Sequence, residues 1–574
     1  MTELLPKLVS LYGLDNAPQL QKRIQRIIDS HRGKIPARDR VLTEQDAILI
    51  TYADQVREGD KPPLKTLENL CEKYLKEVIN GIHILPFFPF SSDDGFSVID
   101  YRKVKEEFGD WADIGELGSK FLLMIDAVVN HISSQSAWFQ SYLRDEQPYR
   151  DYFITLTGDE DLAQVVRPRA SAVQTLFETP SGIKRVWTTF SPDQIDLDFH
   201  NPEVLLEVID LLLTYVENGA QFIRLDAVAY IWKEFGTSCI HLRQAHLLIQ
   251  VLRAVLDMAA PQVALITETN VPHQENISYF GDGENEAQLV YNFALPPLVL
   301  HTFHVGNAEL ISNWVEKGQP PPGETTFINF LASHDGIGLS AARGILSETQ
   351  IESLIDRTLE CGGLVSYKED SEGHRPYELN INFLDALSNP SKHESLEMTV
   401  NRCMCAQSIM LCLKGVPAIY FHSLFGSRGW PAGVEESNQK RSINRQKLLL
   451  SKLENELADH SSLRYHVFQR YSTMLRARAA SSAFHPLGAQ NISHRGASVF
   501  AILRTSPVSE QRVLCLHNVS DQIQTVSIDF EGSSRSSKKD TGLLDLITNK
   551  ILKSDAMDAL ILDPYQTVWL TEES

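Results

Sequence analysis

The sequence predicts an α/β protein, a (β/α)8 TIM barrel with inserted lid domains and a C-terminal β-sandwich domain. Short, nearly continuous apolar runs alternate with longer amphipathic segments, which is typical of buried parallel strands joined by crossover helices. There are eight such runs, the number of strands in a barrel of this class. The expected strands are 47–54, 81–87, 121–130, 222–227, 263–269, 289–294, 327–335 and 415–421.

Segments of different character lie before, within and after this repeat. Residues 1–44 have a charged, helical pattern, and we expect an N-terminal extension packed on the outside of the main domain. The gaps 132–200 and 336–400 are too long for simple crossovers, so they are predicted to be a lid domain and a second insert over the active face. Alternating strand-like runs predict a small β-sandwich over 486–574. The barrel itself then comprises 45–131, 201–335 and 401–485.

Composition and charge limit the class of partner. The formal net charge of −21 argues against nucleic acid or an anionic membrane surface as the main partner. No signal peptide is recognised at the start, and no apolar run is long enough to cross a bilayer. The seven cysteines are scattered, and Cys403 and Cys405 are interpreted as buried free thiols rather than metal ligands. We therefore expect a cytoplasmic protein.

Polar side chains follow four of the expected strands where each strand leaves the core. The four segments are Asp126–His131, Arg224–Asp226, Glu268–Thr269 and His334–Asp335. Because equivalent ends of parallel strands meet at one face, a pocket with at least three carboxylates and two imidazoles is predicted. Each segment alone could be a satisfied polar loop, but the four together favour an active site. A zinc site is disfavoured, since neither HxxEH nor HExxH occurs.

Clustered carboxylates suit glycosyl transfer, whose transition state resembles a positively charged oxocarbenium ion. Arg224 lies two residues before Asp226 on the same strand face, so it should lower the pKa of Asp226 and keep this nucleophile ionised. Glu268 has no adjacent cation, and apolar walls should raise its pKa for general acid/base work. Asp335 is then expected to stabilise the charged ring. The two imidazoles are better placed as donors to sugar hydroxyls than as bases.

The segments DAVVNH, FIRLDAVAY, LITETN and FLASHDGIG resemble the four signature segments of the α-amylase superfamily, glycoside hydrolase family thirteen. ITYADQV, GIHILPFFPFSSDDGF, RPRASAV and VWTTFSPDQIDLD are similar to its sucrose phosphorylase subfamily, and the similarity runs from roughly residue 46 to 450. The resemblance implies Asp226 as nucleophile, Glu268 as acid/base and Asp335 as transition-state stabiliser. Many amylases bind calcium near the segment that matches Asn130, but the phosphorylases generally do not, so no metal and no cofactor are expected.

The resemblance also implies the sugar contacts. Asp94, His131, Arg224, His334 and Arg445 would clamp the glucosyl unit, Phe96, Phe190 and Tyr230 would line its hydrophobic side, and Gln194 would face the acceptor. Arg169 matches a residue that helps to hold phosphate. A solvated loop is the alternative reading for Arg167 and Arg169, although two arginines beside a proline suit an anion.

One loop departs from the sucrose phosphorylase pattern. Those enzymes carry Asp-Leu-Tyr-Gln over the acceptor site, whereas this chain has Arg375-Pro376-Tyr377-Glu378 and then Leu379-Asn380. An arginine in place of an aspartate suits a leaving group with a carboxylate or phosphate. Arg375, Tyr377 and Asn380 are therefore expected acceptor contacts. The loop and the N-terminal extension resemble the glucosylglycerate phosphorylase branch.

The sequence is therefore interpreted as a retaining α-glucosyl phosphorylase. Its expected substrates are 2-O-α-glucosyl-D-glycerate and inorganic phosphate. A homodimer is one of the assemblies compatible with this interpretation. The alternatives are sucrose phosphorylase, sucrose 6'-phosphate phosphorylase, glucosylglycerol phosphorylase and an α-glucoside hydrolase. A non-catalytic amylase-like binding protein is disfavoured, because all three key carboxylates are present.

Overall fold

Eight parallel strands close into a barrel in chain order, which confirms the predicted fold and all eight expected strands. The computed structural model describes residues 3–37, 42–168, 172–318, 320–321, 323–370, 373–392, 394–528, 542–552 and 559–572, without the side chains of 369, 370 and 374. The barrel strands are β1 (Ile48–Thr51), β3 (Gly81–Ile84), β4 (Leu122–Ala127), β10 (Ala220–Leu225), β11 (Ala264–Thr267), β12 (Leu289–Tyr291), β13 (Thr326–Asn329) and β17 (Val416–Tyr420). Their residues are almost entirely buried, as their apolar runs require.

Helices surround the barrel and bury apolar residues against it. In α6 (Arg243–Ala259), buried residues recur three or four apart from Ala245 to Leu256, so one stripe faces the strands. The helix α12 (Leu396–Cys412) is buried nearly all round, and its Cys403 and Cys405 are free buried thiols, as expected. Among the described residues no helix is both long and apolar enough to cross a membrane. The other barrel helices are α2 (Pro63–Tyr74), α3 (Trp111–Lys120), α5 (Pro202–Glu217), α8 (Leu295–Val305), α9 (Glu309–Lys317), α12 (Leu396–Cys412), α13 (Phe421–Leu424), α14 (Pro431–Ser437), α15 (Leu450–Ala458) and α16 (Leu463–Ala479).

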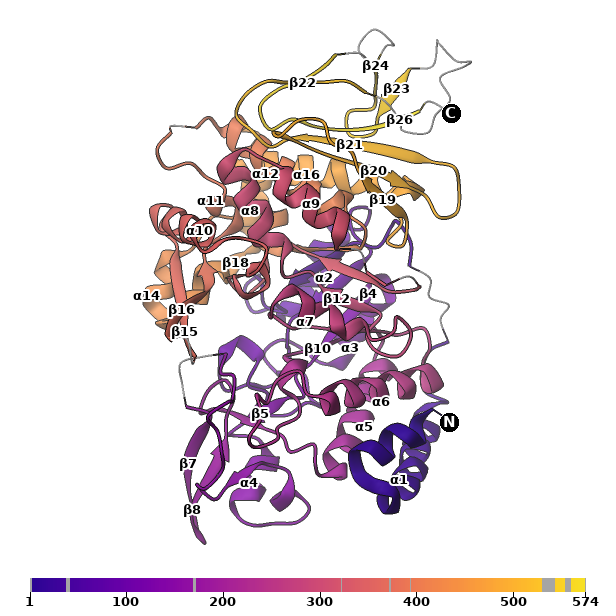
Figure 1. The fold of residues 1–574 in the computed structure, drawn as a ribbon, viewed down its shortest axis with the longest axis vertical. Helices are drawn as coiled ribbons and strands as arrows, with labels where there is room; N and C mark the ends of the chain where they lie inside the picture. The colour runs from indigo at the N-terminus through magenta and orange to yellow at the C-terminus, as the bar shows by residue number, and fades with distance from the viewer. Residues whose placement is uncertain are drawn as a thin grey trace.

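The N-terminal extension, α1 (Leu4–His31), is helical on both sides of a kink at Gly13, whose φ is 81°, and it lies on the outside of the barrel against α5 and α6 (Figure 1). Its buried leucines and isoleucines face the barrel helices. At its end the His31 ring contacts Glu217 at 2.7 Å and Asp210 at 3.0 Å. Residues 4–31 therefore pack on the outside of the barrel.

Both long gaps form substructures with sheets of their own. Residues 132–200 contain α4 (Ala137–Leu143), β6 (Thr155–Leu156), β7 (Gln174–Thr179), β8 (Gly182–Trp187) and β9 (Gln194–Asp196), and β9 pairs with β5 (His131–Ser133). This lid and the C-terminal sheets lie at opposite ends of the molecule (Figure 1). The second insert contains β14 (Ile337–Gly338), α10 (Glu348–Glu360), β15 (Leu364–Asp370), β16 (Gly373–Asn380) and α11 (Phe383–Ala386). Its strands β15 and β16 form an antiparallel hairpin.

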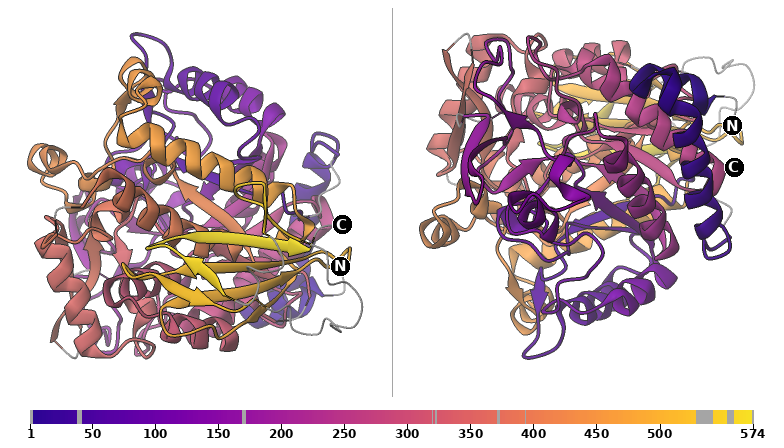
Figure 2. Two further views of the ribbon diagram at one scale, coloured as in Figure 1. Left: turned by 90° about the horizontal axis from the view of Figure 1, so that it is seen from above. Right: turned by 90° about the horizontal axis from the view of Figure 1, so that it is seen from below.

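The C-terminal region has a six-stranded antiparallel sheet and a two-stranded sheet, β22 with β25, in agreement with the expected β-sandwich. Side chains alternate along β20: Val499, Ala501 and Leu503 belong to the core between the two sheets, while Phe500 and Ile502 belong to the barrel core. Figure 2 shows the larger sheet lying across the barrel helices. Its strands are β19 (Ala489–Ile492), β20 (Val499–Thr505), β21 (Arg512–Asn518), β23 (Leu543–Asp545), β24 (Lys550–Leu552) and β26 (Thr567–Glu572), and the smaller sheet has β22 (Gln524–Val526) and β25 (Leu560–Leu562).

A buried lysine joins the lid to the barrel. Lys233 follows β10, is 4% exposed, and its Nζ lies 2.5 Å from an oxygen of Asp196 in lid strand β9. The same ammonium group donates to Oδ1 of Asn130, which follows β4, at 2.8 Å. The lid is thereby fixed to two strand ends that also carry site residues.

Replacing this cation should release the lid from the barrel. Lys233→Met leaves the Asp196 carboxylate buried without its cation, so we expect the free energy of unfolding to fall by about 3–5 kcal/mol in urea titrations. Adding Asp196→Asn should recover part of the loss, because the uncompensated charge is then removed. If Lys233→Met alone were as stable as the parent protein, the role of Lys233 in fixing the lid would be contradicted.

Candidate active site

A cavity of about 360 Å³ opens at the carboxyl ends of the barrel strands, within the size range of small-molecule sites. Its walls come from the barrel, the lid and the second insert, and ten of the predicted site residues line it. These are Phe96, His131, Phe190, Gln194, Asp226, Tyr230, Glu268, His334, Asp335 and Tyr377. The four segments that follow separate strands in the sequence therefore meet in one pocket.

Arg224 lies at the centre of the carboxylate cluster. It sits on β10, beside Asp126 of β4 on one side and Ile266 of β11 on the other. Its Nη1 forms an ion pair with Asp126 and donates to Oδ1 of Asp226 at 2.9 Å. Its Nη2 lies 3.8 Å from Oε2 of Glu268. Arg224 is 2% exposed, so one buried guanidinium serves three carboxylates from three strands.

The net pKa of Asp226 differs from the sequence prediction. Burial raises it to about 7; Arg224 lowers it, as predicted, but Asp126 and Asp335 raise it further. The sequence prediction was wrong because it considered Arg224 without the cost of burial and the two other carboxylates. Burial also raises the pKa of Glu268 to about 7, in the predicted direction, against the effect of Arg224.

Asp226 and Glu268 therefore titrate as a pair that retains one proton near neutral pH. The shorter contact of Arg224, 2.9 Å to Asp226 against 3.8 Å to Glu268, favours the anion on Asp226 and the proton on Glu268. Next to the nucleophile, Ala227 has a φ of 50°, a left-handed conformation that costs an alanine roughly 1–2 kcal/mol. Its N–H donates to Oε2 of Glu268 at 3.0 Å, so the turn after Asp226 holds the acid in place.

The pKa of Asp335 is shifted in the opposite direction to those of Asp226 and Glu268. Burial alone would raise its pKa, but Arg441, His334 and Arg445 together lower it below the usual range. The nearest cation is Arg441, whose Nη1 lies 2.5 Å from Oδ1 of Asp335. An ionised carboxylate in the pocket wall is what a cationic transition state requires.

A second arginine fixes the sugar-clamp segment. Arg445 Nη1 donates to Oδ2 of Asp94 at 2.7 Å, and its Nε donates to the carbonyl oxygen of His334 at 2.9 Å. Gly95 has a φ of 115°, and a Cβ there would lie 2.5 Å from the carbonyl oxygen of Pro86. Only glycine fits this turn, which carries Asp94 to Arg445 and Phe96 into the pocket.

Aromatic rings also line the pocket. Phe96 stacks on His334 at 4.7 Å, and Phe190 meets Tyr230 edge-on at 5.5 Å and His131 at 5.2 Å. Burial lowers the pKa of His334 to about 3 and also lowers that of His131. Both imidazoles are therefore neutral at physiological pH, which suits hydrogen bonding to hydroxyls rather than acid catalysis.

The predicted acceptor residues are only partly brought together. Tyr377 lines the pocket, whereas Arg375 pairs across the hairpin with Lys368 and does not line it. Asn380 is buried and its Nδ2 donates to Oγ of Ser366 at 2.9 Å. Arg169 lies outside the described residues, although Arg167 before it lines the pocket.

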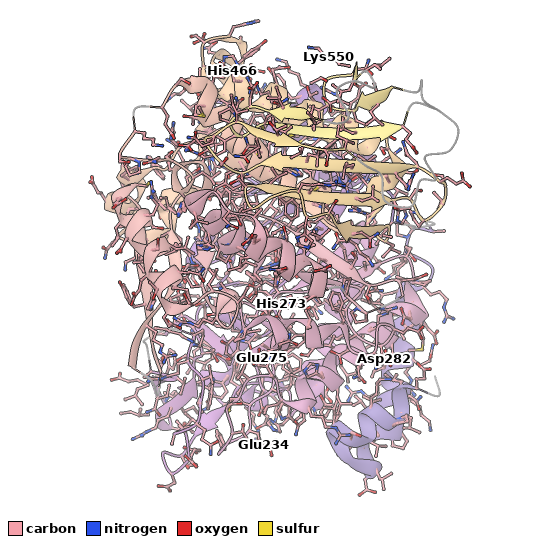
Figure 3. The ribbon with its side chains drawn as sticks, turned by 45° about the horizontal axis from the view of Figure 1, so that its top comes forward. Glu234, His273, Glu275, Asp282, His466 and Lys550 are labelled. Carbon is pink, nitrogen blue, oxygen red and sulfur yellow. The ribbon has the colours of Figure 1, made fainter. Side chains whose placement is uncertain are left out.

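Other charged residues of the pocket were not predicted. Arg343, Lys368, Glu378 and Arg441 line it on the side of the hairpin, and Glu275 of α7 (His273–Ile277) lines it elsewhere. Figure 3 labels His273 and Glu275, which lie in the middle of the view between the C-terminal sheet and the lower end of the molecule. Over the described part of the chain, no group of three or more histidine, cysteine or acidic residues is arranged to hold a metal ion.

Comparison with known proteins places this site in a family. An α-amylase catalytic-domain family model matches residues 52–334. Glucosylglycerate phosphorylase from Allomeiothermus silvanus is 46% identical over 99% of this chain and 98% of its own. The chain belongs to the α-amylase family, glycoside hydrolase family thirteen. Glucosylglycerate phosphorylase from Escherichia coli is 42% identical over 97% of both chains. Sucrose phosphorylase from Bifidobacterium adolescentis is 29% identical over 69% of this chain and 79% of its own.

Solved structures agree with this assignment. Sucrose 6F-phosphate phosphorylase from Thermoanaerobacter thermosaccharolyticum superposes with a TM-score of 0.73 at 25% identity, over 89% of this chain and 98% of that one. The α-amylase from H. orenii, at 19% identity and a TM-score of 0.64, shares the fold over 92% of this chain and all of its own.

The raised pKa of Glu268 predicts a pH-dependent stability difference. The folded protein keeps this proton up to about pH 7, whereas the unfolded chain loses it near the ordinary value of 4.5, so wild-type stability falls as pH rises between them. Glu268→Gln removes that loss and should stabilise the protein by about 1–3 kcal/mol at pH 8. The gain should shrink towards zero near pH 4.5. Urea unfolding at both pH values measures it, and equal differences at both would contradict the assignment.

Proposed function

We propose that this protein is a retaining α-glucosyl phosphorylase that converts 2-O-α-glucosyl-D-glycerate and phosphate to α-D-glucose 1-phosphate and D-glycerate. The observation that carries the reaction type is the Asp226–Glu268 pair on Arg224, because double displacement needs one ionised and one protonated carboxyl group. Three glucosylglycerate phosphorylases that are 42–46% identical over nearly the whole chain support the choice of substrate.

In the first half-reaction, Asp226 attacks the anomeric carbon while Glu268 donates its proton to the glycosidic oxygen. The bond to the glycerate oxygen breaks, D-glycerate leaves, and a β-glucosyl ester forms on Asp226. Asp335, held ionised by its arginines, stabilises the positive charge that develops on the ring. Asp94 and Arg445, which are paired with each other at 2.7 Å, are the proposed contacts to the sugar hydroxyls.

In the second half-reaction, phosphate takes the place of glycerate. A phosphate oxygen attacks the anomeric carbon, the ester bond to Asp226 breaks, and Glu268 accepts the phosphate proton where one is present. Two inversions give overall retention, so the product is α-D-glucose 1-phosphate. The predicted contacts Arg169, Arg375, Tyr377 and Asn380 belong to this half of the site. Val166, Arg167 and Pro168 line the pocket, which supports a phosphate contact from that segment.

We also infer a cytoplasmic location. All seven cysteines are free, which is typical of proteins in a reducing compartment.

An acceptor screen tests the substrate. Purified protein with α-glucose 1-phosphate is offered D-glycerate, glycerol, fructose or fructose 6-phosphate, and phosphate release is measured. We expect D-glycerate to give the highest kcat/KM. Preference for another acceptor would assign the corresponding phosphorylase instead, and release that is equally fast in water alone would indicate a hydrolase.

Removal of the nucleophile tests the mechanism. Asp226→Ala should lower kcat with D-glycerate by at least about 10³-fold, because no glucosyl ester can form. Circular dichroism should report an unchanged fold. Turnover close to that of the parent enzyme would rule out this mechanism.

A further inference from the structure

Arg441 is a pocket-lining cation held by carboxylates on two sides. It lies on a 3-10 turn, Lys440–Asn444 (η6), and its side chain is 23% exposed. Besides the ion pair with Asp335, its Nη2 donates to Oε1 of Glu378 at 2.7 Å and its Nε donates to Oε2 at 3.2 Å. The guanidinium plane is therefore fixed by a side-on pair with one acid and a single contact with another.

Glu378 is built to hold this arginine rather than to contact solvent. It is 1% exposed, and its Oε1 also accepts the N–H of Gly336 at 3.1 Å. A Cβ on Gly336 would lie 2.5 Å from Cγ of Glu378, so the glutamate stem is closely packed against this glycine.

The arginine has donors left for a ligand. A guanidinium carries five N–H donors, and the contacts with Asp335 and Glu378 use three of them. Among the described residues Arg441 has no other hydrogen-bond acceptor, and it faces the cavity beside Tyr377. Arg343 lines the cavity too, and its Nη2 donates to the carbonyl oxygen of Pro376, the residue before Tyr377, at 3.1 Å. Arg343 and Arg441 thus line the cavity together with Tyr377 of the hairpin.

In the proposed double displacement, the group that binds at this position is an anion in both directions of the reaction. The group that leaves and the group that enters occupy the same side of the anomeric carbon, because Glu268 serves both and configuration is retained. With glycerate and phosphate as the two groups, one anion must replace another at a single position. A planar, preorganised guanidinium pairs well with either carboxylate or phosphate.

We propose that Arg441, held in position by Glu378, binds the carboxylate of D-glycerate and then receives phosphate at the same place. The proposal rests on the proposed function and makes Arg441 the residue that determines acceptor specificity. Glu378 is a positioning residue, which acts through Arg441. Arg375, the contact expected from the sequence, is the alternative.

The test compares D-glycerate with glycerol, which has the same carbon skeleton and no charge. The ratio of their kcat/KM values is measured with α-glucose 1-phosphate for Arg441→Ala, Arg441→Lys and Glu378→Gln. Both acceptors meet the same glucosyl-enzyme, so any effect of Arg441 on Asp335 cancels in the ratio. We expect the ratio to fall by about 10- to 100-fold in Arg441→Ala and by less in the two conservative variants. The loss should appear mainly as a higher KM for D-glycerate.

Further measurements separate the outcomes. Arg428→Ala, which removes an exposed arginine paired with Asp385 away from the cavity, should leave the ratio unchanged. An unchanged ratio in the Arg441 variants would overturn the inference, as would a loss confined to phosphate or a loss that appears only in Arg375→Ala. If Arg441→Ala does not fold, the same ratio measured in Arg441→Lys and Glu378→Gln decides the question. A parent enzyme without preference for D-glycerate would instead refute the proposed function.

Discussion

The site depends on one buried cation, Arg224, and on its place in the barrel. Its strand β10 lies between β4 and β11, so one side chain reaches Asp126 on the first neighbour and Glu268 just beyond the second. Three buried carboxylates without this charge would repel one another, and desolvation would hold them protonated. With it, a single proton remains on the pair Asp226 and Glu268. The division of roles between nucleophile and acid thus follows from strand order.

The two inserts are fastened to this centre in the same way, by a cation that lies between an acid of the insert and a polar group of the barrel. For the lid the cation is Lys233, between Asp196 and Asn130. For the hairpin it is Arg441, between Glu378 and Asp335. Both inserts line the pocket. The parts of the chain that select the substrate are therefore attached directly to the part that carries out the reaction. A carboxylate ligand bound to Arg441 would be connected to the transition-state stabiliser, Asp335, through the Arg441 side chain alone.

The strands and the carboxylates at their ends were predictable because both signals are local: a short apolar run followed by a charged residue. The net pKa of Asp226 was not, since it depends on burial and on Asp126 and Asp335, which come from other strands. Arg441 escaped notice because its partner Glu378 is 63 residues away in the chain. Arg375 was selected from its place in a resembling loop and from its charge, whereas in the hairpin its strand partner Lys368 and its neighbour Tyr377 line the pocket instead.

The assignment of the two carboxylates is tested most directly by chemical rescue of Glu268→Ala with azide. α-Glucosyl fluoride needs no proton to release fluoride, so Asp226 can still form its ester, and azide can attack that ester without a general base. The expected product is α-glucosyl azide, formed faster as azide concentration rises. Formation of β-glucosyl azide by this variant would mean that Glu268, and not Asp226, is the nucleophile.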